Sequence, residues 1–147
     1  MSDKLWKEVK KQMSDHSYMS EIDRDKHRVK ATAEIFTPTD LVIRMVRECD
    51  IDSFAPEKTV LDPACGDGQF LVSIKWVKIL FHGMNEKSAL EDIYGIDIMQ
   101  DNVDLCIKRL GGGNIYCDDS LNPKTPQVKF LFNNQNTLES KDYYINT

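Results

Sequence analysis

The sequence predicts an α/β fold, in which helices cover the faces of a mainly parallel β-sheet. Three observations support this prediction: short apolar runs typical of strands, helical patterns of apolar residues between them, and turn residues at each change of pattern. A strand–helix–strand–helix–strand order favours parallel strands joined by right-handed crossovers. A helical segment is expected in front of the sheet.

The N-terminal segment is expected to form helices. Apolar side chains recur at four-residue spacing in Leu5, Val9 and Met13, which predicts a short amphipathic helix over residues 5–13. A second, weaker helix is expected around residues 21–30.

A third helix is expected from Thr37 to near Asp50. Thr37 is a favourable N-cap, Pro38 suits the first helical position, and Asp40 stands three residues after Thr37, as in a capping box. The spacing of apolar residues predicts a buried stripe made of Leu41, Val42, Met45, Val46 and Cys49.

The sheet is predicted to begin with a strand at residues 58–62, followed by a loop at 63–68. The helix after it is expected at 69–81, with a core face of Phe70, Leu71, Ile74, Val77 and Phe81. A second strand is expected at 92–98, and a helix at 101–110 with Val103, Ile107 and Leu110 on one side. Glycines at 111–113 are expected to end this helix. A third strand is expected at 114–116 and a fourth at 127–132. The polar last fifteen residues are expected to be frayed.

The composition is that of one globular domain. The chain has 147 residues, of which 41% are hydrophobic and 29% charged. No run approaches the ~20 apolar residues that a membrane span needs, and the N-terminus lacks an apolar signal core, so a cytoplasmic location is expected. The four cysteines lack the Cys-x-x-Cys spacing of zinc sites and are expected to be reduced core thiols; no metal site is predicted.

The charge distribution leaves two interpretations open. The net charge of −5 does not favour a dedicated nucleic-acid binder, because duplex binding depends largely on Lys and Arg at phosphates. Residues 1–30, however, hold eight Lys and Arg against six Asp and Glu. The basic cluster within residues 24–30 is either a phosphate contact or a solvated helix face.

The most specific feature is VLDPACGDGQF at residues 60–70, where a strand, an acid, a glycine loop and a helix follow one another. Ligands bind at the carboxyl ends of strands in such sheets, and Gly66 and Gly68 would let the backbone approach a ligand closely. The loop lacks the third glycine of the phosphate-binding fingerprint. Asp62 and Asp67 would repel phosphate and suit a ligand with an ammonium or sulfonium group.

Further acids follow the next two predicted strands. Asp97 ends the second strand, about thirty residues after the first loop, where an acid in a nucleotide-binding sheet accepts ribose hydroxyls. Asp118 and Asp119 follow the third strand, near the place of an adenine amino group. Together the strand ends describe a pocket for an adenosine that carries a charged amino-acid arm.

Four motifs in this order resemble those of S-adenosylmethionine-dependent DNA adenine-N6 methyltransferases of restriction-modification systems. The strongest is Asp-Pro-Ala-Cys-Gly-x-Gly-x-Phe at 62–70. Glu-Ile-Phe-Thr-Pro at 34–38 resembles the upstream motif, Gly-Ile-Asp at 95–97 the ribose motif, and Cys-Asp-Asp-Ser-Leu at 117–121 the adenine-side motif. The resemblance covers about residues 30–121 and implies a Rossmann-like class I methyltransferase fold with S-adenosylmethionine as cofactor.

The resemblance also implies a role for each matching residue. The expected cofactor-binding residues are Phe36, Thr37 and Pro38 along the methionine arm; Asp62, Ala64 and Gly66 at its amino and carboxylate groups; Gly68 and Phe70 from the same motif; Asp97 at the ribose; Ile98 on the adenine ring; and Asp119 (or Asp118), Ser120 and Leu121 at the adenine amino group.

The sequence departs from the family pattern after residue 121. The family transfers the methyl group at a downstream Asn-Pro-Pro-Tyr or Asn-Pro-Pro-Phe loop, whose aromatic ring stacks on the flipped base. No such loop occurs here, since Asn122 and Pro123 come too early and Lys124 stands in place of the second proline. The 26 residues after Leu121 leave no room for the target-recognition region or the later strands of a seven-stranded sheet. No catalytic residue is predicted, and the sheet is expected to be truncated.

These observations divide the chain into an N-terminal helical segment (1–33), an S-adenosylmethionine-binding domain (34–132) and a polar tail (133–147). The favoured function is the cofactor-binding part of a site-specific DNA adenine-N6 methyltransferase, with a second subunit supplying the catalytic loop and much of the contact with DNA. The alternative is a non-catalytic module, in homo-oligomeric form, that binds or sequesters S-adenosylmethionine. A degenerate remnant that binds nothing agrees less well with the presence of Asp62, Gly66, Gly68 and Asp97.

Overall fold

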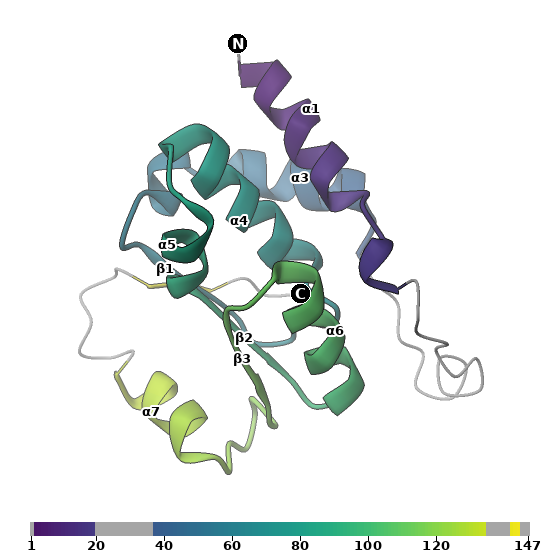
Figure 1. Ribbon diagram of the computed structural model, residues 1–147. Coiled ribbons are helices and arrows are strands. Elements are labelled where there is room, and N and C mark those ends of the chain that lie inside the picture. Colours follow the sequence, from purple (N-terminus) through teal and green to yellow (C-terminus); the bar gives the residue numbers. More distant parts are fainter. Residues whose placement is uncertain (1, 20–36, 135–141, 145–147) are drawn as a thin grey trace.

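The computed structural model describes residues 2–19, 37–134 and 142–144 of the chain. A four-stranded parallel sheet of order β3-β2-β1-β4 forms its centre, with helices on both faces (Figure 1). The strands are β1 (Thr59–Asp62), β2 (Ile93–Asp97), β3 (Asn114–Cys117) and β4 (Asp142–Tyr144). The predicted α/β class with parallel strands is confirmed.

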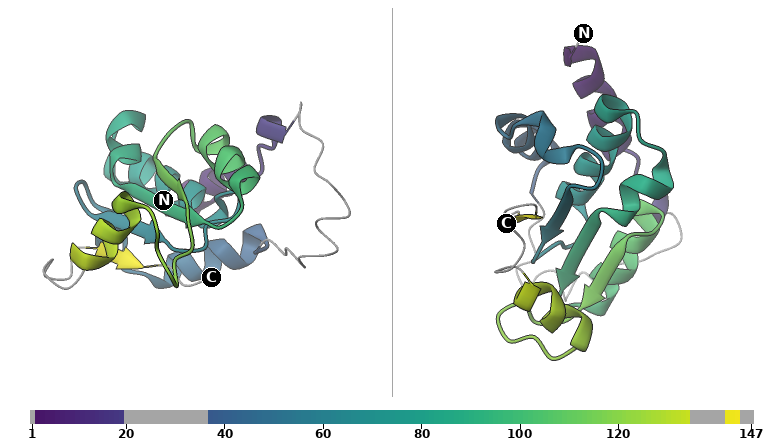
Figure 2. Two further views of the ribbon diagram at one scale, coloured as in Figure 1. Left: turned by 90° about the horizontal axis from the view of Figure 1, so that it is seen from below. Right: turned by 90° about the vertical axis from the view of Figure 1, so that its left-hand side faces the viewer.

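One face of the sheet carries the larger part of the core. α4 (Gln69–His82) and α6 (Gln100–Leu110) lie on this face, after β1 and β2 respectively. α1 (Ser2–Met13) and α3 (Thr39–Glu48) pack against α4 in turn, so that α4 is buried on most of its sides (Figure 2). The core on this face includes Trp6, Val9, Val42, Val60, Leu71, Ile74, Ile93 and Leu110.

The opposite face of the sheet is covered by α7 (Pro126–Asn134). The fully buried Val128 of α7 packs against Leu61 of β1 and Ile96 of β2. Leu61 faces this side while its neighbour Val60 faces the main core, as the alternation of side chains along a strand requires. α7 therefore forms the third layer of the fold.

The register of the strands brings three loops to one edge of the sheet. Asp62 lies opposite Gly95, and Asp97 lies opposite Cys117. Because β1, β2 and β3 run in the same direction, their carboxyl ends lie at the same edge, and the loops that leave them meet there.

Two predictions about the C-terminal region are wrong. Residues 127–132 belong to the helix α7 and not to a strand, because Thr125 and Pro126 supply a helix start that the apolar run obscures. The Thr125 hydroxyl accepts a hydrogen bond from the Val128 N–H at 3.3 Å. The fourth strand is β4, inside the segment that was expected to be frayed, and it pairs with β1 through the partners Val60 and Tyr143.

One α-helix of the described residues has no counterpart in the predictions. α5 (Glu86–Glu91) lies between α4 and β2, and its N-cap is Asn85, whose side chain accepts a hydrogen bond from the Ser88 N–H at 2.8 Å. Gly83 ends α4 in the left-handed conformation with φ of 65°.

α3 begins one residue later than predicted. Pro38 is its N-cap and accepts the first helical hydrogen bond, from the Val42 N–H at 3.0 Å. The prediction of Thr37 as N-cap is therefore wrong; its carbonyl oxygen instead accepts a hydrogen bond from the Gln69 side chain.

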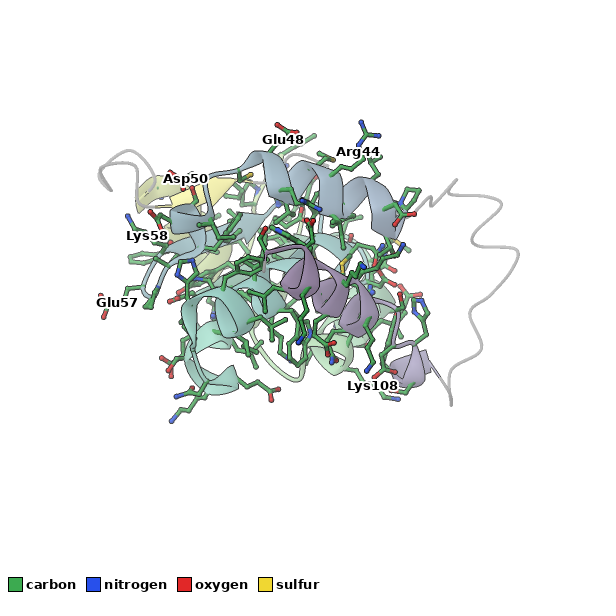
Figure 3. The ribbon with its side chains drawn as sticks, turned by 90° about the horizontal axis from the view of Figure 1, so that it is seen from above. Arg44, Glu48, Asp50, Glu57, Lys58 and Lys108 are labelled. Carbon is green, nitrogen blue, oxygen red and sulfur yellow. The ribbon has the colours of Figure 1, made fainter. Side chains whose placement is uncertain are left out.

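The buried stripe of α3 is also shifted from the predicted one. Val42 and Val46 are buried as expected, together with Ile43. Leu41 and Met45 are exposed by 42% and 40%, because α1 and α4 pack against the other side of the helix. The exposed side also carries Arg44 and Glu48, which extend away from the core (Figure 3).

Three further expectations have mixed outcomes. Ile107 of α6 is exposed, while the neighbouring Cys106 faces the core. All four cysteines are free, but only Cys65 and Cys106 are buried, and Cys49 is exposed. The weak helix expected around 21–30 lies outside the described residues. No helix within the described ranges is both long and apolar enough to cross a membrane.

Candidate functional site

The loop after β1 is a tight turn that only glycine accommodates at two positions. Gly66 and Gly68 have φ of 56° and 98°, in the left-handed region that favours glycine. A Cβ on Gly68 would also lie 2.9 Å from the Cys106 sulfur. The loop begins at the buried Asp62, whose carboxylate accepts a hydrogen bond from the Ala64 N–H at 3.1 Å. The backbone of this loop is thus fixed close to the sheet.

Asp97 fastens the loop after β2 to the loop after β1. Its Oδ2 accepts from the Gly66 N–H at 3.0 Å, and its Oδ1 accepts from the Met99 N–H at 2.9 Å and from Asn102 Nδ2 at 3.1 Å. A carboxylate offers about four acceptor sites. The donors within the described residues therefore leave one site for a ligand hydroxyl, and a second hydroxyl would have to replace the Gly66 N–H.

Main-chain and side-chain hydrogen bonds join all three loops. The Cys65 N–H donates to the Ile96 carbonyl at 2.9 Å, and the Asp118 N–H donates to the Asp97 carbonyl at 3.1 Å. The Ser120 hydroxyl donates to the Pro63 carbonyl at 2.5 Å. The predicted positions in the three strand-end motifs are thus brought together at one edge of the sheet.

The two acids after β3 have different environments. Asp118 is buried, and its carboxylate accepts hydrogen bonds from the backbone N–H groups of Asp119, Lys124 and Thr125 and from the Thr125 hydroxyl, at 2.8 to 3.1 Å. Asp119 is half-buried, and its Oδ1 accepts from the Leu121 N–H at 3.0 Å. Asp118 therefore holds the turn before α7, which favours Asp119 as the acid available to a ligand.

The hydrogen bonds at Asp118 predict a loss of stability in acid. The backbone hydrogen bond from Thr125, with those from Asp119 and Lys124, lowers the pKa of Asp118 from 3.8 to about 2. As the pH falls, Asp118 takes up a proton in the unfolded chain before it does so in the folded chain. Its contribution to the free energy of unfolding is therefore complete above pH 3.8 and is lost as the pH falls towards 2. Asp118→Asn should therefore be less stable than the wild type at pH 7, and the difference should shrink at pH 3.

Urea unfolding followed by circular dichroism at pH 7, 5 and 3 measures this difference. The exposed Asp52, replaced by Asn, is the matched control and should show little difference at any of the three values. An Asp118→Asn deficit that is equally large at pH 3 and pH 7 would contradict the assignment.

The apolar residues expected at the ligand have differing exposures. Ile98 and Leu121 are exposed by 65% and 97%, at the loops where a flat ring could cover them. Phe70, in contrast, is buried in the main core. Thr37 is half-buried and Pro38 is exposed at the start of α3, and Phe36 lies outside the described residues.

Asp67 has a different role from the one its position suggests. Its carboxylate accepts hydrogen bonds from the Tyr18 hydroxyl at 2.8 Å and from Arg109 Nη1 at 3.3 Å, so it faces the interior side of the loop. The expectation that it repels phosphate at the ligand is therefore wrong, since a buried arginine pairs with it. Arg109 and Gln69 were not predicted, because their contacts join segments far apart in the chain. Asn102 was not predicted either, although its partner Asp97 lies only five residues before it.

Cys65, in the middle of the first motif, is a packing group. The pKa of the Cys65 thiol is raised far above its usual range, mainly by a hydrogen bond with the Cys106 thiol and secondly by burial. A thiol that stays protonated is a poor nucleophile. Among the residues that the structure describes, no three His, Cys, Asp or Glu side chains gather in a way that could hold a metal ion.

Comparison with known proteins finds one matching family and a solved structure similar to this chain. The model of the family described as N-6 DNA Methylase matches residues 22–136. A modification subunit of a putative type I restriction enzyme from Vibrio vulnificus YJ016 has a similar structure, with 25% sequence identity and a TM-score of 0.51. The similarity covers 65% of this chain and 22% of that subunit, so this chain spans only part of its length. No curated protein matches the chain.

Proposed function

Since this chain belongs to the N-6 DNA methylase family, we propose that it is the S-adenosylmethionine-binding part of a DNA adenine-N6 methyltransferase. The observation that carries the proposal is the meeting of three loops at one sheet edge. The Gly66 N–H donates to Asp97, and the Ser120 hydroxyl donates to the Pro63 carbonyl. Members of the family generally use S-adenosylmethionine, and the strand-end loops supply groups that match its parts.

The donor set fits a cationic nucleoside better than a phosphate ligand. The methionine arm carries an ammonium group and a sulfonium centre, and the carboxylate of Asp62 at the end of β1 is of the opposite charge. Asp97 has one acceptor site left for a ribose hydroxyl, and displacing the Gly66 N–H would open a second. Exposed Ile98 offers an apolar surface to the adenine ring, and Asp119 can accept from its amino group.

The chain's own residues would bind and orient the methyl donor. When bound, S-adenosylmethionine would supply an activated methyl group, and holding it in line with the target nitrogen is the main contribution expected of such a site. The Asn-Pro-Pro-aromatic loop that holds the flipped adenine in this family does not occur in the 147 residues. We therefore propose that a second methyltransferase subunit supplies that loop and the specific contacts with DNA.

Calorimetric titration with S-adenosylmethionine and S-adenosylhomocysteine tests the proposal. Both ligands should bind with a dissociation constant of about 1 μM, equivalent to about −8 kcal/mol. ATP is the control, because it shares the adenosine part but its phosphates would take the place of the methionine arm beside Asp62, and it should not bind at the same concentration. Absence of binding at millimolar S-adenosylmethionine would contradict the proposed pocket. Methyl transfer to DNA by this chain alone would contradict the need for a second subunit.

A further inference from the structure

We propose that Gln69 is a positioning residue, which sets the peptide group of Thr37 against the loop after β1 and is itself oriented by Arg109. The inference rests on the proposed function, in which Thr37 lies along the methionine arm and the loop after β1 holds its charged end. It concerns what joins these two parts of the pocket, which come from segments about thirty residues apart in the sequence.

The Gln69 side chain bridges the start of α4 to the start of α3. Its Nε2 donates to the Thr37 carbonyl at 2.8 Å and to the Thr39 hydroxyl at 3.2 Å. Its Oε1 accepts from Arg109 Nη2 at 2.6 Å. Only one orientation of the amide satisfies these partners, because a carbonyl oxygen needs a donor and a guanidinium needs an acceptor.

Arg109 makes the orientation of this amide rigid. Its side chain is only 3% exposed and extends from α6, with Nη1 on Asp67 and Nη2 on both Gln69 and the Met13 carbonyl, the latter at 2.8 Å. Its guanidinium also lies 5.1 Å from the centre of the Tyr18 ring. A buried arginine with partners on four sides has little freedom, so it fixes both Asp67 in the loop and Gln69 beside it.

The Arg109 guanidinium therefore holds both the loop after β1, through Asp67, and the start of α3, through Gln69. Asp67 lies between the two glycines of the loop, and Gln69 follows Gly68 directly. A shift of the Gln69 amide would move the Thr37 carbonyl without moving Asp97 or the loop after β2, because neither is bonded to Gln69. The bridge should therefore affect the methionine arm of the ligand and leave the adenosine part unaffected.

Gln69→Glu separates this role from packing. The two side chains have the same shape, and a glutamate keeps its acceptor on Arg109 and can accept from the Thr39 hydroxyl. Its second oxygen, however, cannot donate to the Thr37 carbonyl and repels it. We expect the affinity for S-adenosylmethionine to fall about tenfold, the order expected for one lost hydrogen bond with added repulsion, and the affinity for 5′-methylthioadenosine, which lacks the amino-acid arm, to stay unchanged.

The matched control is Gln127→Glu, an exposed position on α7 that adds the same charge. It should change neither affinity. Equal losses for both ligands in Gln69→Glu, or no loss for either, would overturn the inference, since a merely structural role would weaken the whole pocket.

The carbonyl carbon resonance of Thr37, measured without ligand, keeps the two proposals apart. It should move in Gln69→Glu and stay in place in Gln127→Glu. An unmoved resonance overturns the bridge even where the wild type binds S-adenosylmethionine. A wild type that binds neither ligand overturns the proposed function, and with it the positioning role at the methionine arm.

Discussion

Replacing Lys78 by methionine is expected to lower the free energy of unfolding by about 3–5 kcal/mol, the range for removing one partner of a buried ion pair. Lys78 lies on α4 with no exposed surface. Its ammonium group donates to the carbonyl oxygens of Phe54, Ala55 and Lys58 at 2.9 to 3.2 Å and to Asp92 Oδ2 at 3.0 Å. For a domain that is 5–15 kcal/mol more stable than its unfolded state, this is a large share.

The physical reason is the loss of charge and of donors inside the core. Methionine fills the volume of the lysine stem but leaves the carboxylate of Asp92 without its counter-charge. It also removes one donor from each of three carbonyl groups, of which Ala55 keeps a hydrogen bond from the Lys58 N–H. Burial already lowers the pKa of Lys78, and the hydrogen bond with Asp92 opposes that effect. The site therefore holds a charge that only its four partners make tolerable.

A double-mutant cycle and a surface control make this prediction specific. Asp92→Asn in the Lys78→Met background removes the orphaned charge, so the double variant should be less destabilised than the sum of the two single changes by about 0.5–3 kcal/mol. Lys87→Met on the exposed side of α5 should cost less than about 0.5 kcal/mol. Urea unfolding gives all four values, and a Lys78→Met cost close to that of Lys87→Met would contradict the role.

The elements that could be predicted from the sequence are those in which several local patterns agree. β1, α4, β2, α6 and β3 all lie within two residues of the predicted bounds, because alternation, helical spacing and glycine stops agree there. α7 and β4 were missed for different reasons. The short, mostly apolar run at 127–132 is compatible with either a helix or a strand. The three-residue β4 is defined by its partner β1 and not by its own composition.

The candidate site shows the same division between local and long-range information. The motif residues after β1, β2 and β3 could be found from sequence, since each follows a strand directly and parallel strands bring their ends together. The inward orientation of Asp67 could not be predicted, because it depends on Tyr18 and Arg109. The choice between Asp118 and Asp119 could not be predicted either, because it depends on the hydrogen bonds that Asp118 accepts. Arg109 lies 42 residues from Asp67, and only the fold places them 3.3 Å apart.

Asp97→Ala is expected to weaken S-adenosylmethionine binding by about 10- to 100-fold. The ribose hydroxyl that donates to the remaining acceptor site contributes about 1.5–3 kcal/mol, and 1.4 kcal/mol corresponds to a factor of ten. A second hydroxyl would gain little, because it would have to displace the Gly66 N–H. Because Asp97 also accepts from Gly66, Met99 and Asn102, alanine should in addition lower the free energy of unfolding by about 1–3 kcal/mol. A second variant is therefore needed to separate loss of the ligand contact from loosening of the loops.

Asp97→Asn supplies that separation. Asparagine keeps the size of the side chain and one acceptor oxygen, so it can retain either the Gly66 bond or those of Met99 and Asn102. Its loss of stability should therefore be smaller than that of Asp97→Ala, and the variant should remain folded. The ribose, however, meets an amide donor where it needs an acceptor, so binding should still fall by a large factor. Asp104→Ala, an exposed acid on α6, should change neither quantity by much. Calorimetry and urea unfolding are measured on the same samples. Weak binding by a folded Asp97→Asn variant would support a ribose contact at the end of β2. Full binding by that variant would contradict it.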